Sequence, residues 1–321
     1  MNETGTTTEA AVETDGRSAS ADVRGPLRSA VIVNPVRVED ASRRRTIIES
    51  ELAAAGWPVP IWLETTADDP GAGQARQAVE AGVQVVFVCG GDGTVRSCIE
   101  GLAGTDVALA LVPAGTGNLL ATNLGVLDDT VGAVRLATHG GRRRIDVGYA
   151  NGQAFAVMAG MGFDAALLQD ASPKLKSLIG TPAYVLSAVR HLRDRRMRVR
   201  IALDGGRPLA RRPRTVVIGN VGQLQGGVRL LPEAEPDSGQ LEVAILAPQT
   251  LLQWVALLWG VLRGHRDVAH REVLRASRIV VRSDRDQPRQ LDGDVIDPGR
   301  TLTITLERGA LEVCVPRPES S

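Results

Sequence analysis

Two short glycine-rich segments contain the residues best suited to bind a ligand. CGGDGT (residues 89–94) and PAGTGN (residues 113–118) each follow an apolar run and precede a helical pattern. Glycines at such places let the backbone approach a ligand and expose amide groups at a helix N-terminus, which suits a phosphate chain. Thr94 and Thr116 add hydroxyl donors, and Asp92 suits a magnesium ion, a ribose or a water better than a phosphate. The alternative interpretation is a pair of tight turns in which Asp92 caps the following helix.

Further polar residues follow other predicted strands. Asn34 and Thr65 end the first two apolar runs, so both should lie at the sheet edge where the glycine loops lie. Asn34 either holds a base or ribose or simply ends a strand, since Asn-Pro favours a turn. Far along the chain, QLDGDVID places Asp292 and Asp294 on either side of Gly293. This is either a plain Asp-Gly turn or a turn that lifts Asp292 over the crevice as an acid/base group.

These residues are positioned by two differently built halves of the chain. From residue 27 to about residue 147, short apolar runs alternate with helical patterns, which predicts βαβ units and a parallel sheet. Strand patterns then dominate, with hairpin signals at Asn151-Gly152 and Asp204-Gly205 and with helices predicted over 182–193 and 250–263. The predicted fold class is an α/β N-terminal domain followed by a C-terminal antiparallel β domain.

Composition narrows the class of protein. The chain has 321 residues, and 37 Lys and Arg balance 37 Asp and Glu, so the bulk charge gives no reason to expect nucleic-acid binding. Neither Lys174 nor Lys176 follows a glycine, which excludes a Walker-type phosphate loop. Residues 1–26 read as a disordered tail and not as a signal peptide, and three scattered cysteines fit a reducing cytoplasm. The longest apolar run, residues 251–262, is too short to span a bilayer.

The chain resembles the diacylglycerol kinase catalytic-domain family of soluble lipid kinases, which includes bacterial diacylglycerol kinases, sphingosine kinases and ceramide kinases. GGDGTV, LVPAGTGNLLATNLG, GFDA and LDGD occur in the family's order, and the similarity runs from about Ser29 to Pro316. The resemblance implies a nucleotide domain like that of 6-phosphofructokinase and NAD kinase over 27–147, and a β-sandwich lipid domain over 148–307. A last strand at about 308–316 would return to complete the first domain.

The resemblance also implies roles for individual residues. Asp292 would be the general base, and Asp92 would act with Mg²⁺ at the phosphates of ATP. Matching positions place the nucleotide-binding residues at Asn34, Thr65, Gly90, Gly91, Asp92, Gly93, Thr94, Val95, Gly115, Thr116, Asn118 and Asp294.

Three departures from the family pattern affect this assignment. The usual Asn-Pro-x-Ser-Gly loop is here residues 34–38, so Arg37 is a candidate for a phosphate contact. The usual Asn-Glu after the first glycine loop is Arg96-Ser97, which puts a helix-start contact in doubt. The usual Asp-Gly of a metal site in the second domain has Ser238 before the glycine, which leaves Asp237 as a displaced metal ligand.

The predicted function is transfer of the γ-phosphoryl group of ATP to the hydroxyl of a lipid such as diacylglycerol or a sphingoid base. Such an enzyme would be cytoplasmic, would associate peripherally with the inner face of the membrane, and could form a homodimer. Basic clusters at 190–200 and 211–214 and the segment around Trp254 and Trp259 are the candidates for membrane contact, although a solvated strand and a core helix would explain them too. The alternative functions are an NAD kinase-like small-molecule kinase and a non-catalytic nucleotide or lipid sensor.

Overall fold

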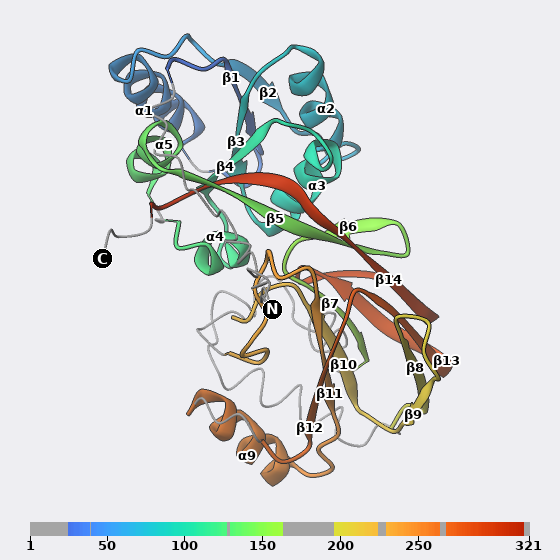
Figure 1. Cartoon of the computed structure of the whole chain (residues 1–321). Coiled ribbons are helices and arrows are strands. Elements are labelled where there is room, and N and C mark those ends of the chain that lie inside the picture. The colour runs from blue at the N-terminus through green and yellow to red at the C-terminus, as the bar shows by residue number, and fades with distance from the viewer. Residues whose placement is uncertain are drawn as a thin grey trace, which may run out of the picture.

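The computed structural model describes residues 25–38, 40–126, 129–162, 196–223, 229–263 and 268–317. Most of the predicted N-terminal tail, the predicted helix over 182–193 and most of the GFDA motif lie outside these residues. Figure 1 shows two halves, joined by long strands, and the labels used below.

The first half is a parallel sheet with helices on both faces, as the alternating pattern predicts. Apolar runs form strands that hydrogen-bond in the order β4-β3-β1-β2, and β1, β3 and β4 are buried along their whole length. Helices α2 and α3 pack on one face of the sheet, and α1 and α5 pack on the other. The bounds are β1 (Ser29–Val33), α1 (Ala41–Ala54), β2 (Ile61–Glu64), α2 (Ala72–Glu80), β3 (Val85–Gly90), α3 (Asp92–Leu102), β4 (Ala108–Pro113), α4 (Leu119–Asn123) and α5 (Thr130–His139).

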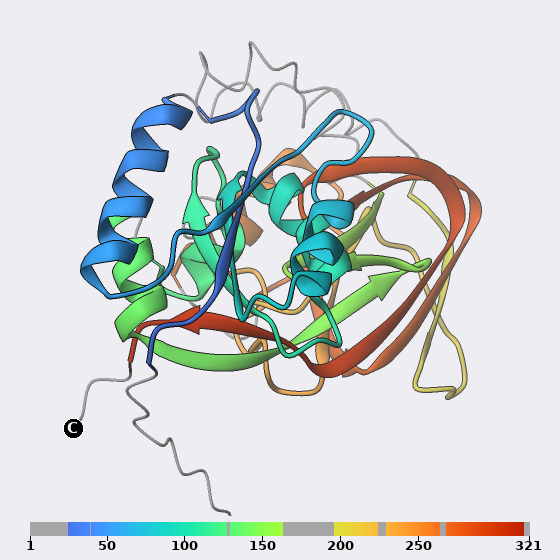
Figure 2. The ribbon, with the colours of Figure 1, turned by 90° about the horizontal axis from the view of Figure 1, so that it is seen from above.

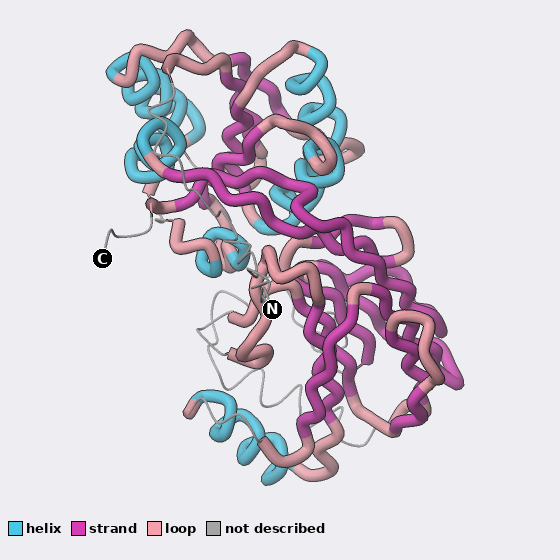
Figure 3. The backbone as a smooth tube through the Cα atoms, in the orientation of Figure 1, coloured by secondary structure: helices cyan, strands magenta, loops and turns pink. Residues whose placement is uncertain are grey.

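The second half is built from antiparallel strands. Figure 3 shows most helices in the first half. Among the described residues of the second half, α9 is the one helix. The bounds are β5 (Gly141–Ala150), β6 (Gln153–Phe155), β7 (Met158–Gly162), β8 (Val199–Leu203), β9 (Leu209–Arg211), β10 (Thr215–Gly219), β11 (Leu241–Leu246), α9 (Leu251–Leu262), β12 (Arg271–Ala276), β13 (Arg278–Leu291) and β14 (Asp294–Val315). The predicted fold class, an α/β domain followed by an antiparallel β domain, is therefore confirmed.

Strand β14 joins the two halves. It pairs antiparallel with β13 and β5, and near its end Val313 pairs in parallel with Leu109 of β4. Figure 2 shows β14 running beside β5 across the molecule. Through β14, the parallel sheet of the first half and the antiparallel strands of the second are hydrogen-bonded into one continuous sheet.

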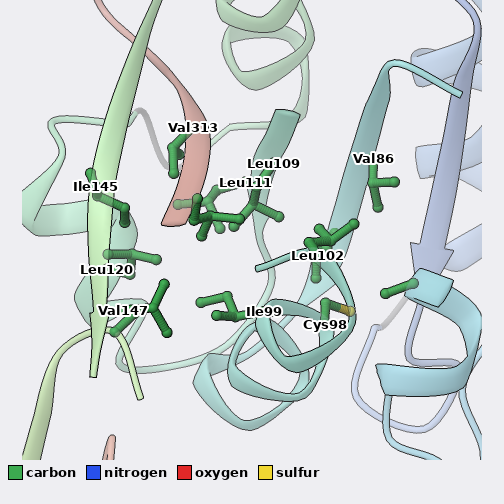
Figure 4. Packing of buried hydrophobic residues seen from close by; sticks show 14 of the residues in the cluster. Val86, Cys98, Ile99, Leu102, Leu109, Leu111, Leu120, Ile145, Val147 and Val313 are labelled. Atoms are coloured by element: carbon green, nitrogen blue, oxygen red, sulfur yellow. The ribbon is translucent and has the colours of Figure 1, made fainter. Parts of the chain in front are cut away.

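The core under the parallel sheet extends to this joining strand. Ile99 of α3 is fully buried, as are Leu109 of β4, Ile145 of β5 and Val313 of β14, and all four belong to one cluster (Figure 4). Burying each such side chain contributes about 1.5–3 kcal/mol. The helix that follows the first glycine loop is thus held firmly against strands from both ends of the chain.

Two features of the structure differ from the sequence-based expectation. Helix α5 was not predicted, because its interior Gly132 and β-branched residues weaken the helical pattern; the Asp129 side chain caps it by accepting the Gly132 amide at 2.6 Å. The last strand, expected by itself at about 308–316, is continuous with the strand before it in β14, with a register shift between Glu307 and Leu311. The irregularity includes Gly309, and a glycine between two apolar runs suggests a turn when only the sequence is considered.

Candidate active site

The two glycine loops touch each other at the carboxyl ends of β3 and β4. A Cβ atom added to Gly115 would lie 2.7 Å from the Cα of Gly91, and one added to Gly90 would lie 2.7 Å from the Cβ of Thr94. Both distances are shorter than real Cβ contacts allow. Gly115 is therefore required by the close approach of the two loop backbones, and Gly90 by the Thr94 side chain that folds over it. The contact between Gly91 and Gly115 brings both predicted phosphate loops to one place.

Asp92 binds the second loop and not the helix in which it lies. Its Oδ1 accepts a 2.7 Å hydrogen bond from the amide of Leu119, the first residue of α4. The alternative that Asp92 caps its own helix is thus not observed, since Asp92 is already the first residue of α3, and that helix has no side-chain cap. Burial raises the pKa of Asp92, the amides of Leu119 and Asn118 lower it, and the charge of Asp294 raises it. The buried carboxylate therefore joins the two loops.

The remaining loop residues lie around the same point. Asn118 adopts φ 46°, and its side chain accepts from the Gly115 amide at 3.0 Å and donates to the Gly115 carbonyl at 2.8 Å. Asn34 donates from Nδ2 to Thr94 Oγ1 at 3.2 Å. Thr65 is buried at the end of β2, and its amide donates to the Val33 carbonyl at 2.9 Å. Val95 follows Thr94 in the first turn of α3, and Thr116 is exposed on the second loop.

Asp292 lies at the tip of the β13–β14 hairpin. Asp292 and Gly293 adopt φ 48° and 89°, the conformation of a tight two-residue turn, so the Asp-Gly signal predicted the turn correctly. The carboxylate is 5% exposed and accepts three backbone amides: Ala156 at 2.9 Å, Val157 at 2.9 Å and Met158 at 2.8 Å. Oδ1 takes two of these bonds and Oδ2 takes one, so Oδ2 keeps the greater capacity to accept a proton.

Burial raises the pKa of Asp292 to about 6, although the three amides and the charge of Arg96 oppose the rise. A carboxylate with that pKa is ionised at neutral pH and is a stronger base than an ordinary aspartate. General bases work best when their pKa lies near the working pH. The backbone of Asp292 forms the plain Asp-Gly turn that the sequence predicts. That turn does not account for the burial of the Asp292 carboxylate or for its three hydrogen bonds to backbone amides.

The hairpin tip reaches the first glycine loop through Asp294. A Cβ on Gly93 would lie 3.0 Å from Asp294 Oδ2, and the same oxygen lies 3.4 Å from Arg96 Nη2. Arg96 Nη1 lies 3.8 Å from Glu100, and Arg96 Nε is buried without a hydrogen-bond partner among the described residues. The guanidinium thus has donor capacity to spare beside the predicted phosphate loop.

A cavity of about 580 Å³ opens next to Arg96, between α3 and the start of β14. Ser97, Glu100 and Gln153 also line it, so its wall is largely polar. Sequence reasoning marked Arg96 as a departure from the family but did not place it between the two domains. The sequence signal that could have drawn attention to this residue was an arginine, Arg96, where the family usually has an asparagine.

Asp237 lies away from these residues. It forms a two-point ion pair with Arg143, at 2.8 Å and 2.6 Å, on the surface between β5 and the loop before β11. No cluster of three or more His, Cys, Asp or Glu suited to a metal occurs in the part of the chain that the structure describes. The metal-binding role of Asp237 stays a prediction.

Two family models match the two halves of the chain. The diacylglycerol kinase catalytic domain matches residues 28–150, and the YegS C-terminal NAD kinase beta sandwich-like domain matches residues 156–315. The exact boundary near residue 147 predicted from the sequence stays a prediction.

Individual relatives cover most of the chain. A Pseudomonas fluorescens protein named "Probable lipid kinase YegS-like" is 32% identical, over 82% of this chain and 87% of its own length. The Bacillus subtilis protein named "Diacylglycerol kinase" is 28% identical, over 83% and 89%. A crystal structure of a diacylglycerol kinase from Bacillus anthracis superposes with a TM-score of 0.73 at 26% identity, covering 90% of this chain and 96% of that one. The chain therefore belongs to the diacylglycerol kinase catalytic-domain family of kinases.

Proposed function

We propose that the protein transfers the γ-phosphoryl group of ATP to the hydroxyl of a membrane lipid, with diacylglycerol or a related lipid such as a sphingoid base as the acceptor. The observation that carries this proposal is the position of Asp292. Asp292 is a buried carboxylate with a raised pKa at the tip of the β13–β14 hairpin, and Asp294, two residues on, lies against Gly93 of the first glycine loop. The names of the relatives support a lipid as the acceptor.

The glycine loops would bind the phosphates of ATP through backbone amides. Phosphoryl transfer requires mainly positioning and neutralisation of charge, which amides at helix N-termini provide without a lysine. Asn34 and Thr65 lie at the neighbouring strand ends, where a nucleoside would extend from these phosphates. Arg96 supplies a cation beside the first loop.

Asp292 would act as the general base. As the lipid oxygen attacks the γ-phosphorus, the O–P bond forms, the bond from the γ-phosphorus to the departing ADP oxygen breaks, and the hydroxyl proton passes to Asp292. The amides of Ala156, Val157 and Met158 fix the carboxylate's orientation before the substrate arrives. Such prior positioning avoids reorganisation during the reaction.

Asp92 fits a role in holding Mg²⁺. Magnesium sites in kinases typically use one or two carboxylates together with substrate phosphates, so a cage made entirely of protein ligands is not required. Burial and the charge of Asp294 raise the pKa of Asp92, so an added cation would be favourable beside it. Bound Mg²⁺ would neutralise charge on the phosphates.

A lipid acceptor requires contact with a membrane. None of the described helices is long and apolar enough to cross one. We therefore propose peripheral association, at the inner face of the cytoplasmic membrane, where ATP and lipid meet.

The pH dependence of turnover tests the role of Asp292 through its neighbour. Because the base must be ionised, kcat/KM should fall about tenfold per pH unit below the pKa of Asp292, which is about 6. Arg96 lowers that pKa, so Arg96→Gln should move the acid limb to higher pH, with the largest loss of activity below pH 6.

Two variants control for a merely structural effect of Arg96→Gln. Arg96→Lys keeps the charge, so the acid limb of its kcat/KM profile should lie close to that of the wild type. Arg76→Gln, on the exposed face of α2, should leave the acid limb at the wild-type pH. An unmoved limb in Arg96→Gln would show that Arg96 does not act on the base.

The proposed activity is tested by incubating the protein with labelled ATP, Mg²⁺ and mixed micelles that carry diacylglycerol, a sphingoid base or a glycolipid. NAD serves as a separate acceptor, because the second domain matches a family described as NAD kinase-like. Label on one lipid supports the proposal and names the substrate class. Label on NAD alone, or ATP binding without any transfer, refutes it in favour of an NAD kinase-like enzyme or a sensor.

A further inference from the structure

Helix α9 carries an apolar stripe that faces away from the protein. Leu252, Val255 and Trp259 follow one another at spacings of three and four residues, and their exposed fractions are 80%, 56% and 56%. Residues at such spacings share one helix face. Large apolar side chains that gather on one face mark an interaction surface more often than isolated ones do.

The opposite face anchors the helix to the β domain. Leu257 and Val261 are buried in one cluster with Val217 of β10 and Leu246 of β11. At the N-terminus, the Thr250 side chain accepts from the Gln253 amide at 3.3 Å. The stripe is therefore presented by a capped helix that is held in place by its other face.

The chemistry of the stripe matches a bilayer surface. Residues 251–262 contain no charged side chain, and the helix ends at Arg263, whose guanidinium lies 4.5 Å from the centre of the Trp259 ring. Tryptophan and arginine at the edge of an apolar face are typical of the boundary between acyl chains and headgroups.

Several arginines line a groove of about 780 Å³ in the same domain. Arg198 precedes β8, Arg200 lies in it and Arg212 follows β9. Arg282 lies directly opposite Arg200 in the β8–β13 pairing. All four are exposed, and none forms an ion pair among the described residues, although Asp284 also lines the groove. Like charges opposite each other in a sheet are unfavourable unless an anion lies between them.

A hydrogen bond links the segment that follows the groove to the segment that precedes α9. Arg214, two residues beyond Arg212, donates from Nε to the Pro248 carbonyl at 3.1 Å, two residues before Thr250. Figure 1 shows α9 and the β8–β9 hairpin both in the second half, away from the parallel sheet. The arginines of the groove and the apolar stripe of α9 thus belong to the same domain.

We propose that α9 and the arginine-lined groove together dock the protein on an anionic phospholipid bilayer, with the α9 stripe in the headgroup boundary. This inference rests on the proposed function, because a lipid acceptor brings the enzyme to a bilayer. A second copy of the chain fits less well, since a symmetric pairing through the groove would bring its arginines against an identical set.

The apolar part is tested with a Leu252→Glu/Val255→Glu variant and vesicles of phosphatidylcholine mixed with phosphatidylglycerol. Cosedimentation of the full chain should fall at least about tenfold, because two exposed apolar groups are replaced by charges that anionic lipid repels. Val59→Glu is the matched control, since Val59 is 80% exposed in the first half and its variant should bind like the wild type.

The electrostatic part is tested with Arg200→Gln/Arg282→Gln on the same vesicles. Binding should fall roughly tenfold, and wild-type binding should fall as salt is added or phosphatidylglycerol is removed. Arg43→Gln/Arg76→Gln, on exposed helix faces of the first half, removes the same charge and should have little effect.

The outcomes separate docking from catalysis. Wild-type binding that ignores phosphatidylglycerol, or unchanged binding by both variants, overturns the docking proposal. A stripe variant that changes only the sedimentation coefficient of the protein without vesicles overturns it in favour of a homodimer interface. Kinase activity on a dispersed short-chain diacylglycerol and a dispersed sphingoid base is measured in parallel: its absence on both in the wild type refutes the proposed function, whereas vesicle binding still tests the surface.

Discussion

Asp292→Asn should reduce kcat for phosphoryl transfer by about 10²–10⁴-fold, the usual contribution of a general base. The substitution is nearly isosteric but removes the proton acceptor. ATP affinity should change little, because the phosphates are expected at the glycine loops and the Asp292 carboxylate contacts backbone amides of residues 156–158. A large loss of kcat with retained ATP binding is therefore the expected pattern.

The experiment needs a check on folding, because the side-chain amide introduced by Asp292→Asn would place an NH₂ group against a backbone amide of the same cluster. A donor facing a donor costs about 1–3 kcal/mol, which thermal unfolding would reveal. Asp286→Asn is the matched control: Asp286 lies on the same strand, is exposed, and forms a surface ion pair with Arg300. Full turnover by a folded Asp292→Asn variant would show that another group accepts the proton.

The fold could be predicted where local signals are strong. Apolar runs ending in glycine loops give the parallel strands, and Asn151-Gly152 and Asp204-Gly205 give hairpins whose positive φ angles the structure bears out. The Asp-Gly turn at Asp292 was predicted for the same reason. Such turns need residues that tolerate positive φ, so the sequence reveals them directly.

Other parts depend on contacts that leave no local signal. The length of β14 is set by pairing with β5, which lies more than a hundred residues away, and Arg308-Gly309 within it reads as a break. The groups that bind the Asp292 carboxylate are backbone amides, which nearly any residue provides. The sequence placed both glycine loops at one sheet edge but did not predict that the backbones of Gly91 and Gly115 touch. The hydrogen bond from the Leu119 amide to the Asp92 carboxylate was not predicted at all.

That link makes Asp92 the second residue whose replacement should have a large effect, and it allows two roles to be separated. In Asp92→Asn, the amide oxygen can still accept the Leu119 amide, so α4 should keep its cap while the charge is lost. If Asp92 holds Mg²⁺, kcat/KM should fall about 100-fold or more and the Mg²⁺ concentration for half-maximal rate should rise, because a metal supplies several kcal/mol of charge stabilisation.

Asp92→Ala removes the charge and the cap together. It should show the same loss of turnover and, in addition, a fall of about 1 kcal/mol in the free energy of unfolding, the usual cost of losing a helix cap. Asp106→Asn, at a carboxylate that is 98% exposed in a surface ion pair, controls for net charge. If Asp92→Asn kept the wild-type dependence on Mg²⁺ and only Asp92→Ala lost activity, Asp92 would serve to join the two glycine loops, and the metal would have to be held by the phosphates and another group. The difference between the two variants therefore measures how much of the site's function depends on charge and how much on the contact between its loops.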